Sequence, residues 1–180
     1  MSGTVGPSTG SAQVRDIVAS VVQAALAPYA VKTYRARVYP LKAEDFPCAL
    51  IYGFDENMTF QTMDFTPTVG ANVCQMVVQV ASRFPTPETA ERGIEIFIGA
   101  ARSAVLQSAA LVGDGGAIER ILSVRTSRVI KAESDDILAE STMIFEMQWS
   151  ELYTLAMDVM TEIDITTGTA PAAMTLTPTN

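Results

Sequence analysis

Residues 137–153 read ILAESTMIFEMQWSELY and hold the clearest two-residue period in the chain. On one side fall four large apolar side chains: Met143, Phe145, Met147 and Trp149. On the other side fall Thr142, Glu146 and Gln148. Side chains alternate between the two faces of a strand, so this pattern predicts a long strand with one face on a core.

Further strands are predicted on the N-terminal side of this stretch. Residues 118–130 form the preceding strand, joined to 137–153 by a polar turn over 131–136. Residues 71–84 predict another long strand, whose core face carries Cys74, Met76, Val78 and Val80. Shorter strands are expected at 33–38, 48–54 and 58–65, with a break at 66–70.

Two segments have the three-and-four spacing of amphipathic helices. The first begins at Ser11, which is expected to cap it, and ends at Pro28. The second begins at Thr86 as cap, followed by Pro87 and Glu88, and runs to the glycine-rich residues 113–116. Its apolar stripe is Ile94, Phe97, Ile98, Ala101, Val105 and Leu106.

The order of elements predicts an α+β fold with a mixed or antiparallel sheet of five to six strands and two α-helices packed on one face. We expect a flexible leader over residues 1–10, one domain over 11–154 and a C-terminal extension over 155–180. The extension is rich in Thr, Ala and Pro and has no core-sized apolar pattern. It is either a disordered end or an arm that orders on a neighbouring subunit.

The composition argues against several classes of function. The net charge of -8 has the wrong sign for binding nucleic acid through phosphate neutralisation. No apolar run approaches the ~20 residues of a membrane span, and the first ten residues lack a signal pattern. The two cysteines, Cys48 and Cys74, are expected as buried reduced thiols. We therefore expect a protein that is made in the cytoplasm and does not associate with a membrane.

The sequence contains no histidine, which removes the commonest general base and the Ser-His-Asp and Cys-His forms of nucleophilic catalysis. The acidic pairs at 44–45, 55–56 and 135–136 are expected in solvated turns. Arg120 and Arg128 are expected on one face of a strand and Arg125 on the other, as a solvated edge or as inter-subunit ion pairs. We expect no catalytic residue, no metal and no cofactor, and a protein that is not an enzyme.

Two segments carry a family resemblance: Arg37-Val38-Tyr39-Pro40, and the run from Phe46-Pro47 through an apolar strand to Asp55-Glu56. Together with the order of elements over residues 11–154, they resemble phage tail terminators similar to the lambda minor tail protein U. The resemblance rests on element order and one local motif, with no catalytic signature. The longer stretch around residues 60–72 and the C-terminal extension depart from that family.

The resemblance implies a virion structural protein at the head-proximal end of a tail. It would form a homohexameric ring that caps the tail tube, stops its polymerisation and binds the head-tail connector or a head-completion protein. DNA would pass through the lumen without specific binding. The alternatives are a tail tube or head-completion protein and, from another class, a small ligand-binding α+β domain or enzyme.

Contacts along the ring axis are expected from two loops, which are equally well read as ordinary mobile loops. The candidate residues of both loops are Asp55, Glu56, Asn57, Met58, Phe60, Asp64, Phe65, Lys131, Glu133, Asp135 and Asp136. The candidate arm residues in the extension are Met157, Val159, Ile163 and Ile165.

Overall fold

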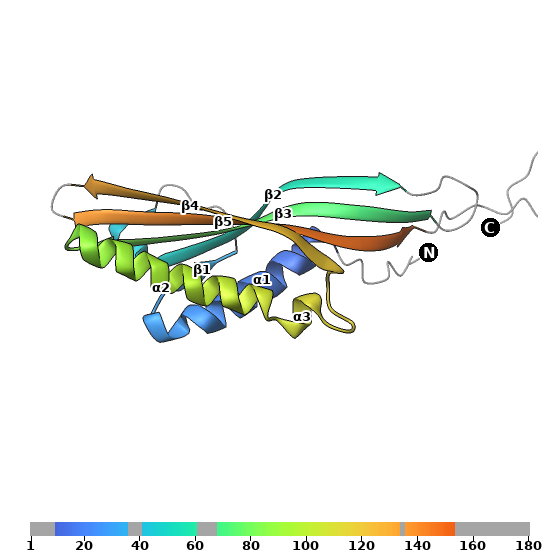
Figure 1. Cartoon of the computed structure of the whole chain (residues 1–180), viewed down its shortest axis with the longest axis horizontal. Helices are drawn as coiled ribbons and strands as arrows, with labels where there is room; N and C mark the ends of the chain where they lie inside the picture. Colours follow the sequence, from blue (N-terminus) through green and yellow to red (C-terminus); the bar gives the residue numbers. More distant parts are fainter. Residues whose placement is uncertain (1–9, 36–40, 61–67, 134–135, 154–180) are drawn as a thin grey trace, which may run out of the picture.

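The computed structural model describes residues 10–35, 41–60, 68–133 and 136–153, which form one sheet with helices on one of its faces (Figure 1). The helices are α1 (Ser11–Leu26), α2 (Pro87–Leu106) and the short α3 (Ala109–Val112), with 3-10 turns at Ala27–Tyr29 and Ala43–Asp45. The strands are β1 (Lys32–Tyr34), β2 (Cys48–Phe60), β3 (Thr68–Phe84), β4 (Arg120–Glu133) and β5 (Asp136–Tyr153).

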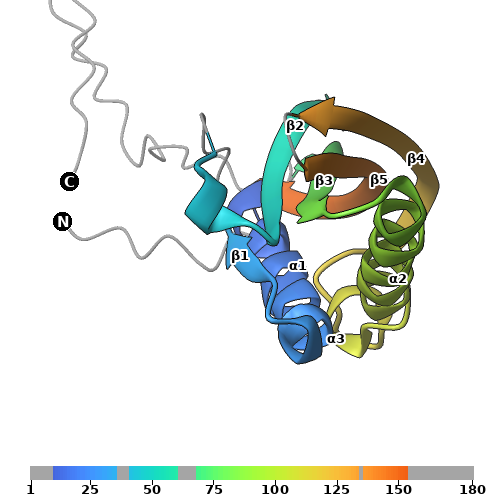
Figure 2. The same ribbon diagram turned by 90° about the vertical axis from the view of Figure 1, so that its left-hand side faces the viewer.

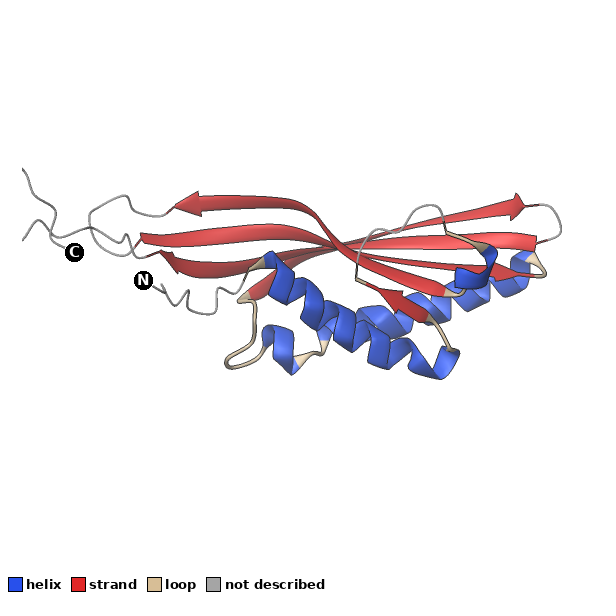
Figure 3. Cartoon of the chain, turned by 180° about the vertical axis from the view of Figure 1, so that it is seen from behind, coloured by secondary structure: helices blue, strands red, loops and turns tan. Residues whose placement is uncertain are grey.

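The sheet is mixed, with the strand order β1-β2-β3-β5-β4. Only β1 and β2 pair in parallel, and the other neighbours are antiparallel. Both long helices lie on the same face, side by side beneath the twisted sheet (Figures 2 and 3). The predicted α+β fold with two helices on one face is confirmed, with five strands in the described residues.

The centre of the sheet is the pairing of β3 with β5, which runs without interruption from Thr68↔Tyr153 to Phe84↔Ile137. The register places Met76 opposite Phe145 and Cys74 opposite Met147, and all four side chains are buried on the helix side. The predicted two-residue period is thus confirmed in both strands, because the helices cover only one of the two alternating sets of side chains.

The helices bury the stripes that their spacing predicts. On α1 the buried residues include Val14, Val18, Val22 and Leu26, and on α2 they include Ile94, Ile98, Ala101 and Val105. Full burial of one aliphatic side chain of this size stabilises the fold by roughly 1.5–3 kcal/mol. The two stripes and the helix-facing side chains of β3 and β5 therefore form the main core.

The two long helices begin differently. Thr86 caps α2: its Oγ1 accepts a hydrogen bond from the Thr89 backbone N–H at 3.3 Å, as predicted for this residue. The predicted cap of α1 is wrong, because Ser11 is already the first helical residue and Gly10 occupies the cap position without a side-chain hydrogen bond. Helix α2 also ends earlier than predicted, at Leu106, and α3 precedes the glycine-rich turn.

Among the described helices, the stretch Pro87–Val112 is long and apolar enough to cross a membrane by length and composition. The expectation that no such run exists is therefore wrong by that measure. One stripe of α2 packs on the sheet as part of the main core, which is the behaviour of an amphipathic helix in a folded domain.

Several predicted strand boundaries are wrong. β2 continues to Phe60, so residues 55–57 are not a loop but join the strand predicted at 48–54 to the start of the one predicted at 58–65, and β3 already begins at Thr68, inside the predicted break. Near the other end of the sheet, Lys131 and Glu133 belong to β4, and Asp136 begins β5, so the predicted polar turn shrinks to residues 134–135, outside the described residues. At Asp55–Asn57 and at Lys131–Glu133, pairing with a partner strand extends the element past residues with low strand propensity.

Candidate assembly surfaces

Three strands run past the helices at one end of the molecule. This strand extension comprises residues 57–60 of β2, 68–73 of β3 and 148–153 of β5, held in register by pairs such as Asn57↔Val73 and Val73↔Gln148. Figure 1 shows these strand ends beyond the start of α1. The extension exposes apolar side chains, with Phe60 at 45% and Leu152 at 67% of full accessibility.

The first predicted contact set lies along β2, in and next to the strand extension. Asp55, Glu56, Asn57 and Phe60 are exposed and Met58 is half-buried. Their register with β3 places Glu56 opposite Cys74, on the helix side, and Asp55 opposite Gln75, on the helix-free side. The set therefore divides between two faces of a rigid strand instead of forming one loop. Asp64 and Phe65 lie outside the described residues.

The second predicted contact set lies where β4 ends and β5 begins. Lys131, Glu133 and Asp136 are exposed there. Arg83 of β3 is the residue that the sequence did not indicate: its guanidinium lies 3.2 Å from Glu133 Oε2, 3.9 Å from Asp136 Oδ2 and 5.3 Å from the centre of the Phe46 ring. These pairs are partly exposed, so each is worth about 0–1 kcal/mol. Asp135 lies outside the described residues.

The two contact sets lie at opposite ends of the sheet. Phe60 is level with Gly70 of β3, while Asp136 lies beside Ile137, which pairs with Phe84. At about 3.3 Å per strand residue, the distance along β3 from Gly70 to Phe84 is roughly 45 Å. The sequence could not give this separation, because it depends on which strands pair.

The two ends also differ in charge. Glu56, Glu151 and Asp55 are all acidic, and β2 and residues 68–82 of β3 contain no Lys or Arg. The opposite end combines Arg83 and Lys131 with Glu133 and Asp136. Arg120 of β4 also lies at the first end, where its Nε donates a hydrogen bond to Gln148 Oε1 at 3.0 Å. The first end thus carries acids on β2 and β5 and one arginine from β4, and the other end is an ion-pair cluster.

The sheet has two unpaired edges in the part of the chain that the structure describes. β1 covers only Cys48–Leu50 of β2, and β4 pairs with β5 alone. Each edge carries a bulge, at Phe54 in β2 and at Leu122 in β4, and both bulged side chains are exposed.

The β4 bulge corrects the predicted arginine pattern. Arg120 pairs with Gln148 and Arg125 with Ile144, so both face the helix-free side. Arg128 faces α2, where it forms an ion pair with Glu95.

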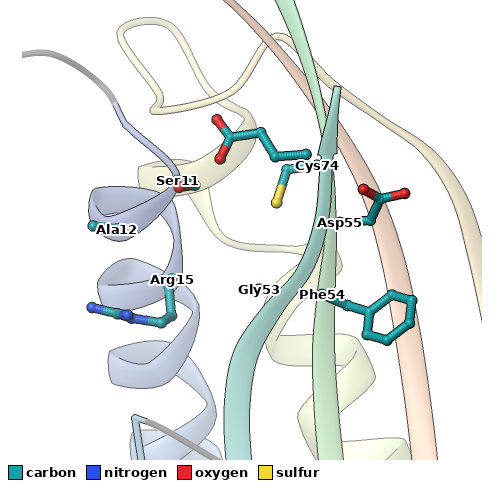
Figure 4. A pocket seen from close by; sticks show the side chains of 8 residues that line it. Ser11, Ala12, Arg15, Gly53, Phe54, Asp55 and Cys74 are labelled. Carbon is teal, nitrogen blue, oxygen red and sulfur yellow. The ribbon is translucent and has the colours of Figure 1, made fainter. Parts of the chain in front are cut away.

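A pocket of about 310 Å³ lies between the start of α1 and β2 (Figure 4). Ser11, Ala12 and Arg15 line it from α1, and residues 53–56 and Cys74 line it from the strands. Figure 4 shows the Cys74 sulfur on the pocket side of the strands and the Phe54 ring pointing away from α1. Arg15 forms an ion pair with Asp16, which lies 3.4 Å away and does not line the pocket. The pocket places Cys74 near the carboxylates of Glu56 and Asp55, and these carboxylates raise the pKa of its thiol.

Both thiols are poor nucleophiles. Burial raises the pKa of Cys74 to about 11, and the carboxylates of Glu56 and Asp55 add to the shift. Burial is also the main cause that raises the pKa of Cys48 to about 11, and the carboxylate of Asp45 is the second cause. Only a thiolate attacks or binds metal readily, so both side chains stay protonated and unreactive at neutral pH. Within the described ranges, no three His, Cys, Asp or Glu side chains gather as metal ligands.

The arm candidates Met157, Val159, Ile163 and Ile165 lie outside the described residues, as do residues 1–9 of the leader expected over 1–10 and the extension at 155–180. The motif residues Arg37-Val38-Tyr39-Pro40 also fall outside them. The second motif is described: Phe46 lies against Arg83, and the apolar run from Cys48 forms the buried start of β2.

No protein-family model matches the chain, and no curated protein matches it. Among solved structures, the chain is similar to a component described as "Virion of native gene transfer agent (GTA) particle". The identity is 13%, the match covers 82% of this chain and 99% of that one, and the TM-score is 0.39. A likeness at this level does not establish a shared fold and carries no argument about function.

Proposed function

We propose that the chain is a virion structural protein that caps a phage tail tube as a ring of identical subunits. The observation that carries the proposal is the long sheet whose two ends differ chemically: a strand extension with exposed Phe60 and Leu152 and one charged residue, Glu151, and, roughly 45 Å away at about 3.3 Å per residue, the Arg83 ion-pair cluster. A tube cap must bind the tube on one side and present a different surface on the other. The family resemblance of residues 11–154 supports the same reading.

The proposal assigns the two contact sets to the two rims. The strand extension, with Met58 and Phe60, forms one rim, and Lys131, Glu133 and Asp136 form the other. One rim binds the tail tube protein, and the other binds the head-tail connector or a head-completion protein. In this proposal the protein is a homohexamer located at the head-proximal end of the tail, after assembly in the host cytoplasm. The C-terminal extension, with Met157, Val159, Ile163 and Ile165, reaches a neighbouring subunit.

In this ring the helix-free face of the sheet lines the channel. That face carries Arg83, Arg120 and Arg125 together with the carboxylates of Asp55, Glu140 and Glu146, and its uncharged polar side chains include Gln75, Gln79 and Gln148. A surface whose basic side chains are balanced by carboxylates neutralises few phosphates, releases few counterions and binds DNA weakly. DNA therefore passes through the ring without being held.

The test adds the purified protein to polymerising tube subunits and measures tube lengths by negative-stain microscopy. Capping gives shorter tubes of narrower length distribution with extra density at one end. Two charge variants, Phe60→Arg in the strand extension and Lys131→Glu at the opposite end, identify the rim that meets the tube, because only one of them abolishes capping.

The alternatives give different results in the same assay. A tube protein polymerises into filaments by itself, and a ligand-binding domain or enzyme leaves the tubes unchanged. Unaltered tube lengths with no density at either end would refute the proposal.

A further inference from the structure

Within the described residues the sheet has two unpaired edges on opposite sides, formed by β4 on one side and by residues 53–59 of β2 on the other. Unpaired edges present free backbone N–H and C=O groups that pair with another strand of suitable direction. From these edges we infer that β4 of one subunit pairs with β2 of the next, so that one sheet continues from copy to copy around the ring.

The strand directions permit this junction. β2, β3, β5 and β4 alternate in direction, since each pairs antiparallel with its neighbour. Rotation about an axis roughly parallel to the strands preserves the direction of every strand. β4 of one copy and β2 of the next therefore run antiparallel, the pairing already used across the rest of this sheet.

The register brings matching features to the same height. Asp55 of β2 pairs with Gln75 of β3, which pairs with Glu146 of β5, which in turn pairs with Ser123 of β4. These four residues therefore lie at the same position along the strand axis. At that height β2 has its bulge at Phe54 and β4 has its bulge at Leu122. Phe54 is 67% exposed and Leu122 is 42% exposed, and a junction at equal height would bury both.

Charge favours a head-to-tail junction over a symmetric one. β4 carries Arg120, Arg125, Arg128 and Lys131 against one acid, Glu133. β2 carries Asp55 and Glu56 and no Lys or Arg. Pairing β4 with β4 or β2 with β2 would place like charges together, whereas pairing β4 with β2 places opposite charges together.

Asp55 and Arg125 are the central pair of this junction. Both side chains lie on the helix-free face, because Asp55 pairs with Gln75 and Arg125 with Ile144. Both are exposed, and neither has an ion pair with another described residue. In this junction Asp55 lies directly opposite Ser123, and Arg125 is two residues further along β4 on the same face. The two side chains are therefore diagonal neighbours, and long side chains reach across that distance. The inference rests on the ring part of the proposed function and adds its contact surface.

The test uses two charge reversals, Asp55→Lys and Arg125→Glu, in the full-length protein. Native mass spectrometry and sedimentation velocity measure assembly over a concentration series. We expect a closed oligomer for the unchanged protein and at least a tenfold rise in the half-assembly concentration for each variant alone. Matched controls, Glu91→Lys and Arg102→Glu on exposed positions of α2, leave assembly unchanged.

Mixing the two variants provides the decisive result. In a head-to-tail ring with alternating variants, every junction again joins opposite charges, so the equimolar mixture assembles like the unchanged protein. The chain carrying both reversals does the same. Circular dichroism establishes that each variant is folded.

Three outcomes would overturn the inference: an unchanged protein that stays monomeric at every concentration, variants that assemble normally, or a mixture that assembles no better than either variant. Bulges that serve to block edge pairing would give the first outcome. The assay contains no tube protein, so a ring that forms but fails to cap tubes refutes the proposed function and leaves this junction standing.

Discussion

The helix-covered part of the sheet and the strand extension use the same three strands but are stabilised in different ways. In the covered part, β3 and β5 bury side chains such as Met76 and Phe145 against α1 and α2. In the extension Asn72 and Trp149 are still buried, but the strand ends beyond them lie past the start of α1 and expose Phe60 and Leu152. Backbone pairing alone holds strands marginally, so the extension depends on the covered part for its stability and presents apolar side chains for a partner.

The largest predicted effect on the free energy of unfolding distinguishes the helix-covered part from the strand extension. Replacing Phe145, which is fully buried, by Ala removes a ring from the main core and lowers the free energy of unfolding by about 3–5 kcal/mol. The matched change Leu152→Ala in the extension alters it by less than about 0.5 kcal/mol. Urea denaturation followed by circular dichroism measures both. Equal losses would show that the extension is as tightly packed as the core.

Asn72 is the polar exception within the extension. It is buried opposite Trp149, and neither its Oδ1 nor its Nδ2 has a hydrogen-bond partner in the described part of the chain. Leaving such groups unpaired costs about 1–3 kcal/mol, so Asn72→Leu should raise the free energy of unfolding by a similar amount.

Asn57→Leu is the control for Asn72, because it lies exposed in the same extension. We expect a change within about 0.5 kcal/mol there. A loss of stability in Asn72→Leu would mean that its carboxamide has a partner in the assembled protein or in solution.

The two glycines of α2 test its inner and outer surfaces. A Cβ at Gly93 would lie 2.3 Å from Phe84 Cε1, and overpacking of this kind destabilises by about 1–3 kcal/mol. A Cβ at Gly99 meets nothing within 4 Å, so Gly99→Ala should stabilise the helix by about 0.5–1 kcal/mol. Thermal unfolding of both variants checks the opposite signs. The same sign at both positions would contradict the packing of α2 on Phe84.

The smallest predicted effect is the difference in stability loss between variants at the starts of α2 and α1. Thr86→Ala removes the side-chain cap of α2 and should cost about 1 kcal/mol. Ser11→Ala at the start of α1 removes no capping hydrogen bond, so the change should be only a few tenths of a kcal/mol. Chemical denaturation at one pH measures the difference. A larger loss at Ser11 would show that this hydroxyl supports α1 in a way that the described residues do not.

The elements with the strongest local signals could be predicted from the sequence. The alternation at Met143–Trp149, the stripes of both helices and the Thr86 cap all depend on residues close together in the chain. The length of β2 could not be predicted, because Asp55, Glu56 and Asn57 have ordinary loop composition and are held in a strand by pairing with β3. Arg120 and Arg125 share a face only because the chain adds one residue at Leu122.

The secondary structure of the candidate surfaces was predicted wrongly, because the segments of β2 and β4 that were expected as loops are strands. The role of these segments in assembly stays a prediction. Arg83 was missed, because it ends an otherwise uncharged strand and meets Glu133 and Asp136 only through sheet pairing. The opposite placement of the two sets also follows from strand order, which no local pattern contains.

The uninterrupted β3–β5 ladder has a mechanical consequence. Hydrogen bonds between antiparallel strands run perpendicular to the strands. A pull applied along the strand axis, from one end of the molecule to the other, loads the whole series of pairs from Thr68↔Tyr153 to Phe84↔Ile137 in shear at once. Pulling across the strands would instead open the pairs one after another, so the chain resists axial tension far better than lateral tension.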